Sequence, residues 1–379
     1  MAMPLLRHQS SLEGFINFSS STPLQDIERL QAKTLFYKIV VYYENQTNIT
    51  TNRPYNRPKL VRLTYEYAIT EASRDNVLRS FFDSIGLSMS GDVDLSCKET
   101  EANVWYSLKG FADFLIDNFF LPLKASSRGT PQPSPTYRSA VQRTRTGERS
   151  YIGTSGRLKT LRGDCLVRDR HRCVISGNFD TTHAVKLMQE CGGDAVDDQG
   201  SPLLGETFEA LEVAHILPHS LTQRNPGSEL DKSRIATLEI LNMFDSDVAY
   251  LIEGPEIDRP RNALSLTHNL HLFFGEFKIF FEPVEDLANT YKIDTFLPYL
   301  ILNGLLPKTR TLFITEQHTI DPPSPRLLAI HRAIAHILHL SAAGLYIERI
   351  LQDAEDEIVR ADGSTALDKL VQLRLAGWV

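Results

Sequence analysis

Three polar residues, His215, Asn262 and His271, follow one another in apolar surroundings and carry groups suited to phosphodiester hydrolysis. That reaction needs an activated water, a cation on the non-bridging oxygen and help for the leaving oxygen. A neutral histidine can take the proton of the water near pH 7, and we expect His215 to do so. We expect Asn262 to orient the imidazole of His215, and His271 to bind the metal.

Short strands and one helix must position these groups. The apolar pattern predicts a strand over residues 211–216, an extended piece over 262–266 and a helix that runs through His271. A strand or turn at 173–177 precedes them, and a strand at 277–283 follows. The three candidate residues therefore fall on elements that can lie close together.

The motifs of this region resemble those of the HNH (His-Asn-His) endonucleases. The resemblance covers roughly residues 165–283 and rests on stretches in the family's order: a cysteine-containing turn at 173–177, Ala-His-Ile-x-Pro at 214–218, an Asn-containing strand at 262–266 and His-Leu-Phe-Phe at 271–274. The continuation into Gly275 and a Phe-Glu-Pro strand is similar to the fungal branch. The resemblance implies a small ββα fold, one divalent metal ion (Mg, Mn or Zn) and hydrolysis of DNA.

Two positions depart from the family's pattern. Many members carry Asp or His just before the general base and again four residues after the last histidine, where this chain has Ala214 and Gly275. Other side chains can substitute as metal ligands, and two of them, His268 and His271, are three residues apart on one expected helix. The candidates besides His271 are His268, Glu212 and Glu276, with His219 and Asp258 as further substitutes.

A basic stretch precedes the motifs. Residues 124–172 hold twelve Lys/Arg and three acidic residues, a local charge of +9 in a chain of net charge −7. Such a stripe is typical of phosphate contact, although a solvated linker has the same composition. The residues expected to bind nucleic acid are Arg143, Arg145, Arg149, Arg157, Lys159, Arg162, Arg168, Arg170 and Arg172.

The 379-residue chain is long enough for two or three domains, and its pattern predicts an α+β protein. We expect a mainly helical domain at 1–123, a basic flexible linker at 124–160, the HNH-like domain at 161–285 and a helical region at 286–379. Expected helices include 22–43, 71–84, 108–120 and a long one at 327–359 with a possible break at Gly344. The linker has no apolar periodicity with which to offset its ordering entropy.

Several classes of protein are disfavoured. No window offers about 18 or more uninterrupted apolar residues, and the start lacks a long apolar core, so we expect an intracellular protein, nuclear or cytoplasmic, without a membrane span. The four cysteines include no C-x-x-C pair, which favours buried thiols over disulfides or a zinc knuckle.

Three functions stay open at this point. The first is a metal-dependent endonuclease acting on DNA. The second is a non-catalytic module that binds nucleic acid or protein on an HNH fold. The third is an interaction protein in which the helical ends act. The fold can discriminate between them: if His215, Asn262 and His271 do not converge within one metal-sized pocket, the enzyme hypothesis in this form fails.

Overall fold

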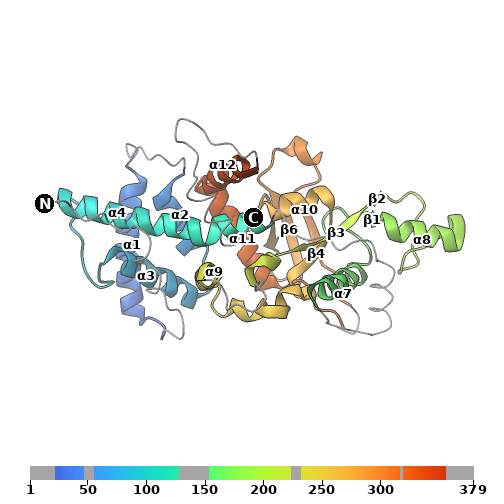
Figure 1. Cartoon of the computed structure of the whole chain (residues 1–379), viewed down its shortest axis with the longest axis horizontal. Helices are drawn as coiled ribbons and strands as arrows, with labels where there is room; N and C mark the ends of the chain where they lie inside the picture. Colours follow the sequence, from blue (N-terminus) through green and yellow to red (C-terminus); the bar gives the residue numbers. More distant parts are fainter. Residues whose placement is uncertain (1–21, 47–54, 128–152, 223–231, 316–318, 356–379) are drawn as a thin grey trace. The chain divides into compact units, whose positions relative to one another are not determined.

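The computed structural model describes residues 22–46, 55–127, 153–222, 232–315 and 319–355. The chain divides into two compact units: one comprises residues 1–125, 224–249 and 336–379, and the other comprises residues 126–223 and 250–335. Helices and small sheets are mixed (Figure 1), in agreement with the expected α+β class.

The first unit is helical. Its core is aromatic, with Phe81 in edge contact with both Phe36 and Phe111 at centroid distances of 4.9 and 5.9 Å. The helices expected at 22–43 and 71–84 are confirmed as α1 and α3, whereas the one expected at 108–120 is the middle of a longer helical stretch that runs from Lys98 to Ser127. That helix passes through a π-turn, Ile116–Phe120, without interruption. The elements are α1 (Asp26–Glu44), α2 (Arg57–Glu66), α3 (Glu71–Ile85), α4 (Lys98–Leu115), α5 (Leu121–Ser127), α9 (Lys232–Leu241) and α12 (Ala343–Glu355).

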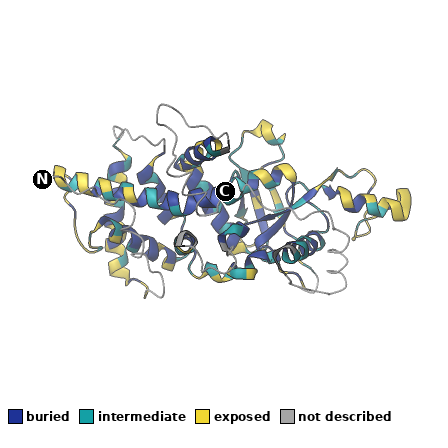
Figure 2. Cartoon of the chain, viewed as in Figure 1, coloured by how far each residue is buried: buried dark blue, intermediate teal, exposed yellow. Residues whose placement is uncertain are grey.

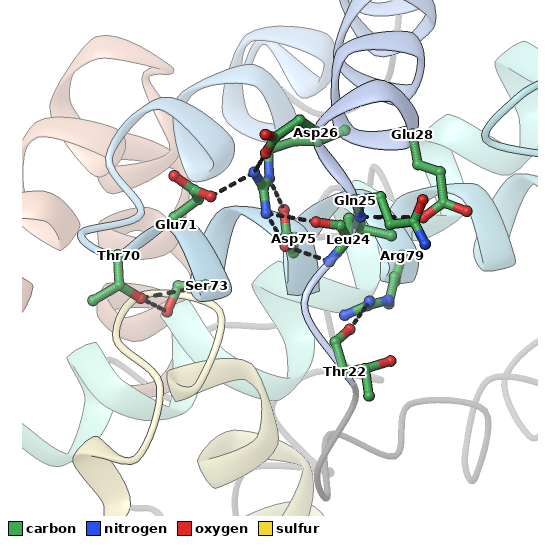
Figure 3. Close-up of polar contacts among 11 residues, drawn as sticks. Thr22, Leu24, Gln25, Asp26, Glu28, Thr70, Glu71, Ser73, Asp75 and Arg79 are labelled. Atoms are coloured by element: carbon green, nitrogen blue, oxygen red, sulfur yellow. Dashed lines mark hydrogen bonds and ion pairs between the residues drawn. The ribbon is translucent and has the colours of Figure 1, made fainter.

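Arg29 fixes the start of α1 to α3 through the buried carboxylate of Asp75. Figure 3 shows Asp75 beside Leu24 and Gln25 at the start of α1. Its Nε donates to Asp75 Oδ1 at 2.7 Å, and its Nη2 donates to Asp75 Oδ2 at 3.0 Å. The backbone N–H of Leu24 donates to the same Oδ2 at 2.9 Å. Gln25 and Glu28 form a capping box. Each of these contacts satisfies a backbone group or a charge at the point where the helix begins.

The second unit contains three small sheets. β1 (Phe179–Asp180) pairs with β2 (Phe208–Glu209) in parallel, and β3 (Leu211–His215) pairs with β4 (Ala263–Thr267) antiparallel. β5, β6 and β7 form an antiparallel sheet in that order. The remaining elements are α7 (Gly153–Arg168), α8 (Thr181–Cys191), α10 (His268–Gly275), β5 (Ile279–Pro283), β6 (Thr290–Thr295), β7 (Lys308–Thr311) and α11 (Pro325–Leu340), which begins in this unit.

Two of the predicted boundaries are wrong. Residues 124–127 and 153–160, expected in a flexible linker, are helical, and 128–152 lie outside the described residues. α7 forms because Leu158, Leu161 and Cys165 make an apolar face that packs on the β3–β4 sheet. The region at 286–379, expected to be helical, contains β6 and β7, where Tyr291 and Ile293 alternate inward.

The long helix expected at 327–359 is divided. The break falls between α11 and α12 at residues 341–342, where Ala342 has a φ of 62°, and not at Gly344. Among the described residues no single helix is long and apolar enough to cross a membrane, although α11 and α12 meet the length and composition criteria as a bent pair. Both helices bury most of their apolar side chains (Figure 2).

Candidate metal centre

The β3–β4 sheet and α10, which follows β4 directly, carry the residues that were expected to form one site. Side chains along a strand alternate between the two faces of a sheet. Val213 packs against apolar side chains of α7, so Val213 and His215 lie on the α7 face. Glu212 lies on the opposite face, where it bonds side chains of α10. The candidates on β3 are therefore divided between the two faces.

The residues that converge with His215 are His219 and Asp258. His219 begins the 3₁₀ turn His219–Thr222, and Asp258 ends the 3₁₀ turn Gly254–Asp258. Asp258 Oδ1 lies 3.2 Å from His215 Nε2 and 2.7 Å from His219 Nδ1. The three possible ligand atoms lie within 4.8 Å of one another. The side chains of His215, His219 and Asp258 are only 2%, 9% and 1% exposed, so the group is buried and could hold a metal ion.

The hydrogen bonds assign the protons of this group. Burial alone would raise the pKa of Asp258, but hydrogen bonds from His215 and His219 outweigh it and hold that pKa well below its usual range. An ionised carboxylate only accepts, so His215 Nε2 and His219 Nδ1 are the donors. Burial lowers the pKa of His215 despite the opposing effect of Asp258, which keeps the imidazole neutral near pH 7. His215 Nδ1 is buried and has no hydrogen-bond partner within the described ranges, so it keeps an unused lone pair.

Arg157 of α7 completes the surroundings of Asp258. Its Nε donates to Asp258 Oδ2 at 3.1 Å, so the carboxylate receives both histidines on one oxygen and the guanidinium on the other. The side chain of Arg157 is 23% exposed, more than that of His215, His219 or Asp258. It is therefore the member of the group that is most accessible to solvent.

Asn262 makes contacts that differ from those expected. It is fully buried, and its Oδ1 accepts from the backbone N–H of Leu217 at 2.9 Å. Its Nδ2 donates to the carbonyls of Leu217 and Ile257, both at 2.9 Å. The expectation that its amide oxygen orients the imidazole of His215 is corrected, because that oxygen is used by the backbone. Asn262 joins the loop that leaves β3 to the turn that ends at Asp258, and so holds the two loops of the metal group together.

His271 belongs to a second polar group on the α10 face. Its Nδ1 lies 2.7 Å from Glu212 Oε2, and His268 Nδ1 lies 3.0 Å from Glu212 Oε1. Burial would raise the pKa of Glu212, but the bonds from His271 and His268 lower it. Glu276, the other predicted ligand, forms an ion pair with Lys278 at 2.6 Å. The structure thus groups His271 with His268 and Glu212, whereas His215 is grouped with His219 and Asp258. The expected convergence of His215, Asn262 and His271 on one metal-sized pocket is therefore corrected, although His271 is near enough to add to the effect of burial in lowering the pKa of His215.

Packing explains the small residue at position 275. A Cβ built on Gly275 would lie 3.1 Å from the carbonyl oxygen of Ser127, a contact tighter than most real Cβ contacts. The Ser127 hydroxyl in turn donates to the Gly275 carbonyl at 2.5 Å. A larger side chain at this position would require the end of α5 to move by a few tenths of an ångström, so this contact favours glycine.

Arg168, predicted to bind nucleic acid, is an internal structural residue. It is 1% exposed, and its guanidinium donates to both carboxylate oxygens of Asp169 at 2.7 and 2.8 Å. It also donates to the carbonyls of Pro260 at 2.6 Å and Ala263 at 2.9 Å. A nucleic acid cannot reach a guanidinium that is buried and saturated in this way, so this assignment is wrong.

Most of the other members of the basic stretch that lie in the described ranges also have internal partners. Arg172 pairs with Asp197 and Glu206 at 2.9 and 3.1 Å. Arg162 donates to the Leu211 carbonyl, and the guanidinium of Arg170 lies 4.5 Å from the centroid of the Phe313 ring. Lys159 is partly exposed, and Arg143, Arg145 and Arg149 lie outside the described residues.

Residues 173–282 of the 379-residue chain match the model of a family described as HNH endonuclease (HNH_2). This match includes His215, His219, Asp258, Asn262 and His271, and it agrees with the resemblance seen in the sequence motifs. No curated protein and no solved structure matches the chain.

Proposed function

We propose that this chain, an HNH endonuclease homologue over residues 173–282, is a divalent-metal-dependent nuclease that hydrolyses phosphodiester bonds of DNA. The observation that carries the proposal is the buried convergence of His215, His219 and Asp258 within the matched segment. Burying two imidazole rings and a carboxylate costs free energy, and clusters of buried titratable groups are typical of functional sites. The family match supplies the class of reaction.

The donor set suits a metal ion of borderline softness. Imidazole nitrogens and a carboxylate are common ligands of zinc and of other first-row ions, whereas magnesium prefers oxygen ligands and retains several waters. We therefore favour Mn²⁺ or Zn²⁺ over Mg²⁺. When bound, such an ion would polarise the phosphodiester and lower the pKa of a bound water.

Within the group we assign water activation to His215, and metal binding to His219 and Asp258. His215 Nε2 donates to Asp258, and His215 Nδ1 holds the lone pair that can take the proton of the attacking water. Asp258 would then stabilise the imidazolium, in the way that a carboxylate supports a general-base histidine.

A plasmid cleavage assay at low salt tests the proposal. Wild type is compared in Mg²⁺, Mn²⁺, Zn²⁺ and EDTA with His215→Ala and His219→Ala, and with His339→Ala as a matched change at an exposed histidine. We expect metal-dependent cutting by wild type and the control, and a loss of about 10²-fold or more in the two site variants.

Metal titration of the same variants separates the two roles. His215→Ala is expected to bind Mn²⁺ as wild type does, while His219→Ala is expected to lose affinity. Loss of binding in His215→Ala would make that residue a ligand and not the base. Absence of cutting by folded wild type, with salt-sensitive DNA binding retained, would favour the non-catalytic binding module.

A further inference from the structure

We propose that Arg157 and the metal ion compete for Asp258, and that metal binding redirects Arg157 to the phosphate of the substrate. The inference rests on the proposed function, because it requires that an ion binds at Asp258. It assigns to Arg157 a role that links the loading of the metal to the capture of an anionic substrate.

Asp258 is a buried carboxylate with a cation beside it. Its side chain is 1% exposed, and Arg157 Nε donates to its Oδ2 at 3.1 Å. Its Oδ1 lies 3.2 Å from His215 Nε2 and 2.7 Å from His219 Nδ1. In the absence of an ion, the guanidinium of Arg157 supplies a positive charge that compensates the buried carboxylate.

A divalent ion at Asp258 would repel the guanidinium of Arg157. The ion would place two positive charges within a few ångströms of the guanidinium, in surroundings where charges are poorly screened. Asp258 would then be shared by two cations, and the Arg157–Asp258 pair would weaken. Linkage is reciprocal. If metal binding weakens the Arg157–Asp258 pair, then the pair lowers the affinity of the site for metal by the same factor.

A phosphate group can replace Asp258 as the partner of Arg157. A guanidinium can form paired hydrogen bonds with two phosphate oxygens, and it keeps its charge at every relevant pH. Arg157 is the most solvent-accessible member of the group at 23% exposed. A phosphodiester anion that binds near the ion could therefore take the place of Asp258 as the partner of Arg157. Metal binding would then raise the affinity of the site for phosphate through Arg157.

The experiment measures Mn²⁺ binding by calorimetry in wild type, Arg157→Gln and Arg157→Met. Lys292→Gln serves as the control, since it makes the same charge change at an exposed ion pair on β6. We expect both Arg157 variants to bind Mn²⁺ about fivefold more tightly than wild type and the control variant to be unchanged. Dimethyl phosphate, a diester anion too small to be held by remote contacts, then probes substrate affinity. Saturating Mn²⁺ is expected to raise its affinity in wild type and not in Arg157→Gln.

Each other outcome overturns the inference in a distinguishable way. Weaker or unchanged Mn²⁺ binding in Arg157→Gln would show that Arg157 positions Asp258 and does not compete for it. Failure of both variants to fold would show that the ion pair is structural. If wild type bound Mn²⁺ no more tightly than Asp258→Asn, the proposed metal site itself would fail, and this inference with it.

Discussion

Substitution of Asn262 by Ala should destabilise the protein and not simply remove a catalytic group. The side chain is fully buried and satisfies three backbone groups, the N–H and carbonyl of Leu217 and the carbonyl of Ile257. A buried group left without a partner costs about 1–3 kcal/mol. With three groups affected, we expect a loss of about 3–9 kcal/mol in the free energy of unfolding, against about 5–15 kcal/mol for a typical domain.

Urea denaturation of Asn262→Ala beside wild type measures this loss. Asn178→Ala is the matched control, because Asn178 Nδ2 makes an exposed hydrogen bond, to Glu209, and its removal should cost less than about 1 kcal/mol. Asn262→Asp keeps the shape of the side chain but puts a carboxylate oxygen, which cannot donate, against the carbonyls of Leu217 and Ile257. This variant should lose as much stability as Asn262→Ala. An Asn262→Ala protein as stable as wild type but unable to cut DNA would refute the structural role and restore the catalytic one.

Three further predictions follow from buried or paired groups. Arg168→Met should lower the free energy of unfolding in urea by about 3–5 kcal/mol, because the buried Asp169 loses its guanidinium; weaker DNA binding at unchanged stability would contradict this. Burial lowers the pKa of His331 from 6.5 to about 3, so the unfolded state binds a proton more readily than the folded state. The free energy of unfolding should therefore fall by about 1.4 kcal/mol per pH unit as the pH drops below 6.5. The same dependence of stability on pH in His331→Phe would contradict this. Glu212→Gln should leave Mn²⁺ affinity within about twofold of wild type, since Glu212 lies opposite His215, and lost binding would move the metal to the α10 face.

Local patterns predicted the elements well where one face is buried and the ends are marked. α3 ends at Gly86, which adopts the left-handed conformation, and the strand expected at 277–283 is confirmed as β5, although its first three residues are all buried and do not alternate. β6 and β7 were missed because a strand of six or four residues is specified by its pairing partner more than by its own composition. The first half of α7, which falls in the expected linker, was missed because its apolar face is sparse and is stabilised by packing on β3 and β4.

The site was predicted in part for a related reason. His215, Asn262 and His271 are recognisable from motifs, but motifs do not give the direction of a side chain. Glu212 and His215 are an odd number of residues apart on one strand, so their opposite faces could have been derived from the sequence. Asp258 and His219 were named from the sequence only as possible substitute ligands. Their approach to His215 could not be derived, because it depends on a 3₁₀ turn and on the backbone contacts of Asn262.

Anomalous diffraction from crystals soaked in Mn²⁺ tests the central claim most directly, because it locates the ion without relying on activity. We predict a peak about 2.0–2.2 Å from a ring nitrogen of His219 and from a carboxylate oxygen of Asp258, as expected for nitrogen and oxygen ligands. We also predict that Arg157 has left Asp258 Oδ2. A peak between Glu212 and His271, with the group around His215 unchanged, would contradict the claim.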